Sequence, residues 1–504
     1  MGGILTAPAQ GGFHCIFLFQ ATTIAGQFVK SFYCTQQKMT LFLNQRRKEV
    51  ELMGTFTLHK HDATNSKVGG GNTTLGRREF LQAGAAGATF GLAAFLAAKR
   101  GAASSAGSRT AIGESDGFPN KITDACRPFD QKYTIFARGL WDPEVQSKWV
   151  KFATAPTSKE SGRTQLDKAL YNAGWAVEYR FAEWSMNGQP DTDAYQWNTW
   201  TNPRKWEFEN VQDASNKVKK AAKFLGACLV GIARYDPLWT YSSLLKIVKF
   251  QESQPEHWLR PPAGIEHIPT RLPFEPKSVV VMAVEMDYGA IACSPTHIAG
   301  AGTGLGYSRM AELGWSVRRF LSELGYRSFA CGNDTALSIP YAVAAGLGEI
   351  GRQGCLITRE FGPRVRLVKV FTELELKPDT PQTFGVAAFC KKCKRCAESC
   401  PAKAIPFGDP TLEGPTISNN PGVEKWYLNP EKCFDFWVEN GVDCANCITS
   451  CPYNKTEMWN HRLISRLTAL PGDQLHYLMA RMDKIFGYGN TFDKRANAEW
   501  WKEE

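Results

Sequence analysis

The stretch FCKKCKRCAESCP, residues 389–401, decides how the carboxy-terminal part of this chain folds. Its four cysteines follow the spacing Cys390-x2-Cys393-x2-Cys396-x3-Cys400, and Pro401 comes directly after them. Gaps of two residues let one tight loop direct three thiol groups towards a common centre. The stretch therefore predicts a loop folded around a bound metal centre.

A second cysteine run follows at residues 433–452, CFDFWVENGVDCANCITSCP. It repeats the first run, with the first gap stretched from two residues to ten. Two runs that each end in Cys-Pro are typical of bacterial ferredoxins with two 4Fe–4S clusters, in which the fourth cysteine of each run binds the other cluster. The predicted ligands are Cys390, Cys393, Cys396 and Cys451 for cluster 1, and Cys433, Cys444, Cys447 and Cys400 for cluster 2.

Zinc sites and disulfides are the alternative uses of these cysteines. Zinc sites have four-ligand sets without a shared Cys-Pro pattern. An exported protein could oxidise its thiols, but gaps of two residues suit metal binding better. The other seven cysteines are expected to be small buried apolar groups.

Composition and charge limit the class of protein. The chain has 504 residues, of which 43% are hydrophobic and 21% charged, as in globular proteins of roughly three domains. The sequence contains no uninterrupted apolar run of 18 or more residues, which argues against a polytopic membrane protein. Residues 1–106 hold 11 Lys/Arg against 4 Asp/Glu, so only about +3 of the net charge of +10 remains for the body of the chain, residues 107–504. Such a body offers little attraction for nucleic acid.

The amino-terminal part contains an export pattern. Arg77 and Arg78 precede Phe80 and an apolar stretch of small residues at 83–98, which is typical of a twin-arginine signal. We expect residues 53–106 to be this signal peptide and residues 1–52 to be an upstream mis-start or a disordered extension. The alternatives are an Ala-rich helix flanked by basic residues and an unusual extension.

The body between the signal and the clusters reads as an α/β region. Residues 107–209 are rich in Trp and show few clear periods, whereas helical and strand patterns alternate from residue 210. We expect helices at 166–176, 211–225, 310–324 and 341–347, and strands at 228–233, 278–284 and 365–376. Tyr307 would lie at the start of the third helix. Arg366 would lie on the apolar face of the last strand, where a cation requires a partner. Gly302-x-Gly304-x-Gly306 is a weak phosphate-binding signal.

These features together resemble the corrinoid-dependent reductive dehalogenases of organohalide-respiring bacteria. The likeness rests on the export signal, the α/β body and the paired cysteine runs. It extends to four local strings: AKFLGACLVGIARYDPLWTYS (222–242), GYSRMAELGW (306–315), AAGLGEIGRQGCLITREFGPRVRLVKVFT (344–372) and FCKKCKRCAESCPAKAI (389–405). The match is diffuse over residues 107–205 and absent from residues 1–75.

The resemblance implies a nitroreductase-like α/β (α+β) core that binds base-off cobalamin, followed by a ferredoxin-like domain with two clusters. By local motif, the Tyr, Asn and Arg of the family's corrinoid pocket are Tyr307, Asn333 and Arg366 here, and Trp437 matches an aromatic wall of the substrate pocket. The chain lacks the Asp-x-His-x-x-Gly motif that supplies a lower cobalt ligand in other cobalamin proteins, which agrees with a base-off corrinoid.

The resemblance also implies the reaction R–X + 2e⁻ + H⁺ → R–H + X⁻ on a small organohalide. Tyr307 would donate the proton, Arg366 would stabilise the tyrosinate left behind, and Asn333 would orient the phenol or the substrate. A quinol-linked electron donor and a small integral-membrane anchor subunit are implied as partners, with the enzyme peripheral on the outer face of the cytoplasmic membrane.

Two other functions remain as alternatives. Epoxyqueuosine reductases share the corrinoid core and tandem clusters, but they are cytoplasmic and act on transfer RNA. A ferredoxin-type electron carrier would not need the long α/β body. The expected divisions are residues 107–209 as a covering region, 210–385 as the cobalamin-binding core, 386–460 as the ferredoxin-like domain and 461–504 as a tail that packs on the core.

Overall fold

The computed structural model describes residues 118–181, 195, 197, 200–250, 262–455, 476–477, 479–481 and 488–502. All of them belong to one unit, residues 108–504. The predicted signal with Arg77 and Arg78, and the predicted extension before it, lie outside the described residues.

A four-stranded antiparallel sheet forms the centre of the body, in the order β1-β4-β8-β5. The strands are β1 (Leu229–Arg234), β4 (Ser278–Glu285), β5 (Ser328–Cys331) and β8 (Val365–Thr372). Seven residues of β4 are buried in succession, since this strand is covered on both faces. The three strands expected from the sequence are present, although β8 ends at Thr372 and not at residue 376.

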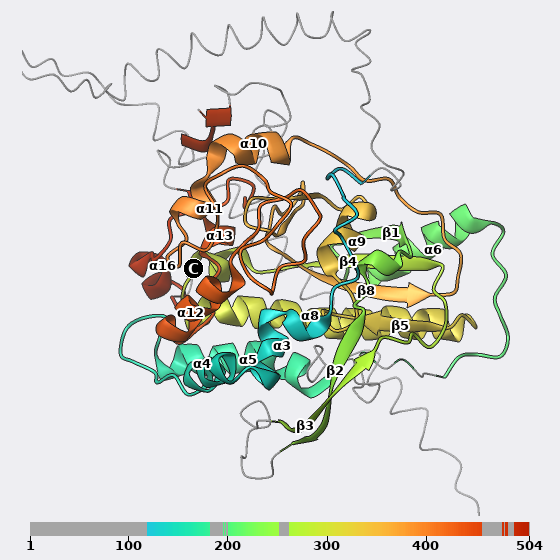
Figure 1. The fold of residues 1–504 in the computed structure, drawn as a ribbon, viewed down its shortest axis with the longest axis horizontal. Coiled ribbons are helices and arrows are strands. Elements are labelled where there is room, and N and C mark those ends of the chain that lie inside the picture. Colours follow the sequence, from blue (N-terminus) through green and yellow to red (C-terminus); the bar gives the residue numbers. More distant parts are fainter. Residues whose placement is uncertain are drawn as a thin grey trace, which may run out of the picture. The chain divides into compact units, whose positions relative to one another are not determined.

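Helices cover both faces of this sheet (Figure 1). On one face, α6 (Val211–Phe224) and α8 (His297–Glu323) contribute apolar side chains to a core with alternate residues of β4 and β8. On the other face, α9 (Ser338–Ala344) packs against the remaining residues of the strands. The body is therefore a layered α+β fold, with α8 and β8 in direct contact.

Helix α8 begins ten residues earlier than the sequence predicts, so the prediction of its start near Tyr307 was wrong. Its first turns include the glycine-rich segment, which packs against α5 (Gln165–Phe181). A Cβ at Gly304 would lie 2.3 Å from Cδ1 of Trp175, and a Cβ at Gly174 would lie 2.6 Å from the carbonyl oxygen of Ala301. These glycines serve close helix packing, which agrees with their weak signal for phosphate binding.

The other predicted helices differ from the structure mainly at their ends. Helix α5 is longer than expected, and α9 ends at Ala344 before Gly346, whose φ of +73° favours glycine. The remaining elements are η1 (Gln131–Tyr133), α3 (Ile135–Trp141), α4 (Pro143–Ala153), η2 (Pro237–Trp239), β2 (Ser243–Phe250), β3 (Pro262–Pro269), α7 (Tyr288–Ala292), β6 (Glu349–Ile350), β7 (Leu356–Ile357), α10 (Val386–Cys393), α11 (Arg395–Glu398), α12 (Pro430–Asn440), α13 (Asn446–Thr449) and α16 (Lys494–Glu499).

The carboxy-terminal residues that the structure describes contact distant parts of the chain. Nη2 of Arg395 donates to the carbonyl of Tyr488 at 2.7 Å, and Nε1 of Trp501 donates to Asp167 at 2.9 Å. No helix within the described ranges combines the length and apolar character needed to cross a bilayer.

Candidate active site and iron–sulfur centres

The structure brings Tyr307, Asn333 and Arg366 together from three separate elements. Tyr307 lies on α8, Asn333 in the turn after β5, and Arg366 on β8. Nδ2 of Asn333 donates a hydrogen bond to the phenol oxygen of Tyr307 at 3.2 Å. The guanidinium carbon of Arg366 lies 4.8 Å from the centre of the Tyr307 ring. A phenol with an amide donor and a cation beside it can release a proton and stabilise the anion that remains.

Arg366 is held beside α8 by a hydrogen bond to Thr303 and by attraction to the nearby carboxyl group of Asp443. Its Nη2 donates to the hydroxyl of Thr303 at 3.4 Å, while its Nε has no hydrogen-bond partner among the described residues. Burial raises the pKa of Asp443 to about 6, and the opposing charge of Arg366 limits that rise. The partner that the sequence requires for Arg366 is thus a hydroxyl, with a carboxyl group nearby.

Trp175 completes the surroundings of Tyr307. Its ring stacks on the phenol, with centroids 5.0 Å apart and an interplanar angle of 21°. The ring of Tyr179 stacks in turn on Trp175, with centroids 5.6 Å apart. The sequence contains only a general signal for this role, an aromatic spacing of four residues at Tyr171, Trp175 and Tyr179, of which Tyr179 lies beyond the helix expected at 166–176.

Trp437 lies on α12, and its ring belongs to an aromatic cluster that α12 forms with α3 and α4. Its ring centre is 5.8 Å from that of Phe136 and 6.3 Å from those of Phe152 and Phe434. The indole Nε1 is buried without a hydrogen-bond partner among the described residues. Among the residues that the structure describes, Trp437 has its ring contacts with Phe136, Phe152 and Phe434 and none with Tyr307, so its place in the substrate pocket stays a prediction.

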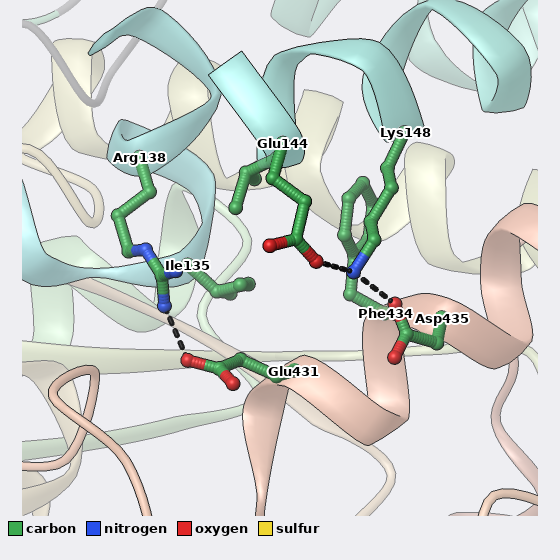
Figure 2. A pocket seen from close by; sticks show the side chains of 8 residues that line it. Ile135, Arg138, Glu144, Lys148, Glu431, Phe434 and Asp435 are labelled. Atoms are coloured by element: carbon green, nitrogen blue, oxygen red, sulfur yellow. Dashed lines mark hydrogen bonds and ion pairs between the residues drawn. The ribbon is translucent and has the colours of Figure 1, made fainter. Parts of the chain in front are cut away.

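Ion pairs attach α12 to the helices α3 and α4 (Figure 2). Arg138 pairs with Glu431, and Lys148 pairs with both Asp435 and Glu144 at 2.8 Å. The cavity between them is small and its charged groups bind one another, so it is not a plausible ligand site. The ion pairs instead fix the helix that carries Cys433 and Trp437.

A cavity in the ferredoxin-like part is lined by four cysteines. They come from both runs and are Cys390, Cys393, Cys396 and Cys451. None forms a disulfide in the structure, and all four are at least partly buried. Burial raises the pKa of Cys390 to about 11, so an unoccupied thiol would stay protonated. The donor set and its enclosure fit an iron–sulfur cluster, whose positive iron ions favour thiolates.

The other four cysteines gather in the same way. Burial and, to a smaller extent, the neighbouring thiols of Cys444, Cys400 and Cys355 together raise the pKa of Cys433 to about 12. Cys355 was not predicted as a neighbour of this group. The run GCLIT, in which it lies, gave no signal beyond a buried apolar residue.

Comparisons with known proteins identify the class to which this fold and these centres belong. Residues 389–455 match the sequence profile of the 4Fe-4S dicluster domain, and this range contains all eight cysteines of the two runs. The chain is 41% identical to a tetrachloroethene reductive dehalogenase of Dehalobacter restrictus, over 65% of this chain and 69% of the relative. It is 34% identical to the tetrachloroethene reductive dehalogenase of Sulfurospirillum multivorans, over 74% of this chain and 75% of the relative.

The fold is also that of a solved dehalogenase. The catabolic reductive dehalogenase NpRdhA aligns with a TM-score of 0.56 and 21% identity, over 78% of this chain and 50% of that chain. The protein is an iron–sulfur oxidoreductase, and it belongs to the reductive dehalogenases. This membership decides against an epoxyqueuosine reductase and against a simple ferredoxin-type carrier.

Proposed function

We propose that the protein removes halide from a small organohalide by R–X + 2e⁻ + H⁺ → R–H + X⁻. The contact of Tyr307 with Asn333 and Arg366 is the observation that carries this proposal, since it supplies a proton donor with two groups that stabilise its anion. Chlorinated ethenes are the first substrates to test, because relatives 34–41% identical are named for tetrachloroethene.

We propose base-off cobalamin as the cofactor beside Tyr307. A bound corrinoid would supply the low-valent cobalt that attacks the carbon–halogen bond. The surroundings of Tyr307 suit a polar cofactor, because Nε of Arg366 and Oδ1 of Asp443 are buried without hydrogen-bond partners among the described residues. Tyr307, Asn333 and Arg366 would face the cofactor and the substrate.

The chain's own residues would control the proton. Trp175 and Arg366 lie against the ring of Tyr307 and not against its hydroxyl, so the hydroxyl is the part of the side chain that would meet the substrate. That hydroxyl would give its proton to the carbon that loses the halide. The N–H of Asn333 and the positive charge of Arg366 would then stabilise the tyrosinate.

We propose that the two clusters are bound by ligands exchanged between the cysteine runs. Cys451 would complete the set of the first run, and Cys400 that of the second. The shared cavity of Cys451 with Cys390, Cys393 and Cys396 supports this exchange. When bound, the clusters would supply one-electron carriers for the two-electron reaction.

The cellular setting is also a proposal. The Arg77-Arg78 pattern supports twin-arginine export, and the chain would lie on the outer face of the cytoplasmic membrane. A small integral-membrane subunit would anchor it, and a quinol-linked donor would reduce it. The small charge of the body supports the absence of nucleic acid among its partners.

The substitution Tyr307→Phe tests the catalytic role. Turnover of chlorinated ethenes should fall by about 100-fold or more, since general acid catalysis contributes on the order of 10²–10⁴. Corrinoid and iron contents should not change. Tyr326→Phe is the matched control, because the Tyr326 hydroxyl donates to the carbonyl of Trp206 far from this site. Full activity of Tyr307→Phe would refute the proton-donor role, and a panel of ethenes, alkanes and phenols would define the substrate.

A further inference from the structure

Lys369 is a buried cation in the middle of β8. Its side chain is fully buried, and Nζ donates to the carbonyl of Gly332 and to the hydroxyl of Ser338, the latter at 2.7 Å. Burial raises the pKa of the nearby Asp334 to about 6, and the charge of Lys369 opposes that rise. A lysine buried this deeply is costly unless its ammonium is well hydrogen-bonded. The turn at residues 332–338 provides these bonds.

This ammonium starts a chain of hydrogen bonds that ends at Tyr307. The hydroxyl of Ser338 lies 3.0 Å from Oδ1 of Asn333, and Nδ2 of Asn333 lies 3.2 Å from the phenol oxygen of Tyr307. The chain thus joins one face of the sheet, where Lys369 and α9 lie, to the helix α8 on the other face.

The chemistry of lysine fixes the direction of every bond in this chain. An ammonium has three donors and no acceptor, so Ser338 must accept from Lys369. The single hydroxyl proton of Ser338 is then donated to Asn333, because the alternative acceptor, the carbonyl of Gly332, is farther away at 3.4 Å. The amide oxygen of Asn333 therefore faces Ser338, and its NH2 group faces Tyr307.

We infer that Lys369 and Ser338 are positioning residues that keep the Asn333 amide in this orientation. The inference rests on the proposed role of Tyr307 as proton donor. With the NH2 group towards it, the phenol oxygen accepts, and its own proton is free for the substrate. If the amide turned over, its oxygen would accept the phenol proton and withhold it from the reaction. The amide would also lose its ability to stabilise the tyrosinate.

The substitution Ser338→Ala removes the link but retains the buried charge. We expect kcat to fall about 10-fold, since a catalytic group that loses its orientation costs one to two orders of magnitude, with KM within about two-fold of wild type. Ser338→Thr retains the hydroxyl and should restore kcat. Ser322→Ala is the control, because Ser322 is fully buried and its hydroxyl hydrogen-bonds with that of Ser328, outside the chain of bonds that leads to Tyr307.

A second readout does not depend on turnover. Nuclear magnetic resonance of oxidised holoenzyme, labelled with ¹⁵N at the asparagine side chains, reports on the Asn333 amide. Its NH2 signal is assigned as the one that is absent from the spectrum of Asn333→Asp. That signal should shift or broaden in Ser338→Ala and stay unchanged in Ser338→Thr and Ser322→Ala. An unmoved signal, or wild-type kcat in Ser338→Ala, would overturn the inference. Full activity in Tyr307→Phe would instead refute the proposed role of Tyr307 as proton donor, so the two failures are distinguishable.

Discussion

Replacing Arg352 should change the reduction potential of cluster 1. Arg352 is 1% exposed and lines the cavity of Cys390, Cys393, Cys396 and Cys451. Its Nε and Nη2 donate to the carbonyl of Cys390 at 3.0 and 2.9 Å, and its guanidinium lies 4.7 Å from the ring centre of Trp426. A buried positive charge at this place favours the reduced, more negative cluster.

The size of the effect follows from Coulomb's law. With an effective dielectric constant of about 20 and a separation on the order of 8 Å, one added negative charge is attracted by about 2 kcal/mol. For a one-electron couple this is roughly 90 mV. Arg352→Met should therefore lower the midpoint potential of cluster 1 by on the order of 50–100 mV.

Arg352→Lys separates the charge from the hydrogen bonds. Lysine keeps the charge but loses the fork that also binds the carbonyls of Pro406 and Gly408 at 2.7 and 2.8 Å. Both variants should lower the thermal midpoint, because each lost bond to a charged group costs about 1.5–3 kcal/mol. Only Arg352→Met should show the full change in potential.

Potentiometric titration followed by electron paramagnetic resonance measures both clusters in one sample. Cluster 2 serves as the internal control and should keep its potential. An unchanged potential of cluster 1 in Arg352→Met, or an equal shift in Arg352→Lys, would refute the electrostatic reasoning.

Three further predictions concern other parts of the molecule. Cys451→Ser should lose about half of the iron and the signal of cluster 1, whereas Cys400→Ser should lose the signal of cluster 2; the same lost signal in both would contradict the exchange of ligands. Gly304→Ala should lower the free energy of unfolding by about 1–3 kcal/mol, and the thermal midpoint with it, because the added Cβ would meet Cδ1 of Trp175 at 2.3 Å, although alanine normally favours a helix. An equal or higher midpoint would show that the helices adapt. Burial lowers the pKa of His297 to about 4 from 6.5, so the unfolded chain binds the extra proton and stability should fall as pH drops from about 6.5 towards 4. Anaerobic thermal unfolding of His297→Phe should show a smaller fall over this range, and an identical pH profile would exclude His297 as its cause.

Part of the fold was predictable because the signal was local. The continuous apolar runs of β1 and β4 identified buried strands. They did not reveal that the sheet is antiparallel, because a strand covered on both faces has the same pattern in either direction. The start of α8 was missed because glycine disfavours an isolated helix. The close contact with α5, which is visible only in the tertiary structure, explains the glycines.

The site divides in the same way. The sequence by itself predicted the class of metal centre, because two cysteine runs that each end in Cys-Pro are typical of proteins with two 4Fe–4S clusters. It also singled out Tyr307, Asn333 and Arg366 through a family resemblance. Only the tertiary structure decided that Trp175 stacks on Tyr307 and that Lys369 and Ser338 orient Asn333. Hydrogen bonds and ring contacts act over about 3–6 Å between residues distant in the chain, and no local spacing specifies those distances.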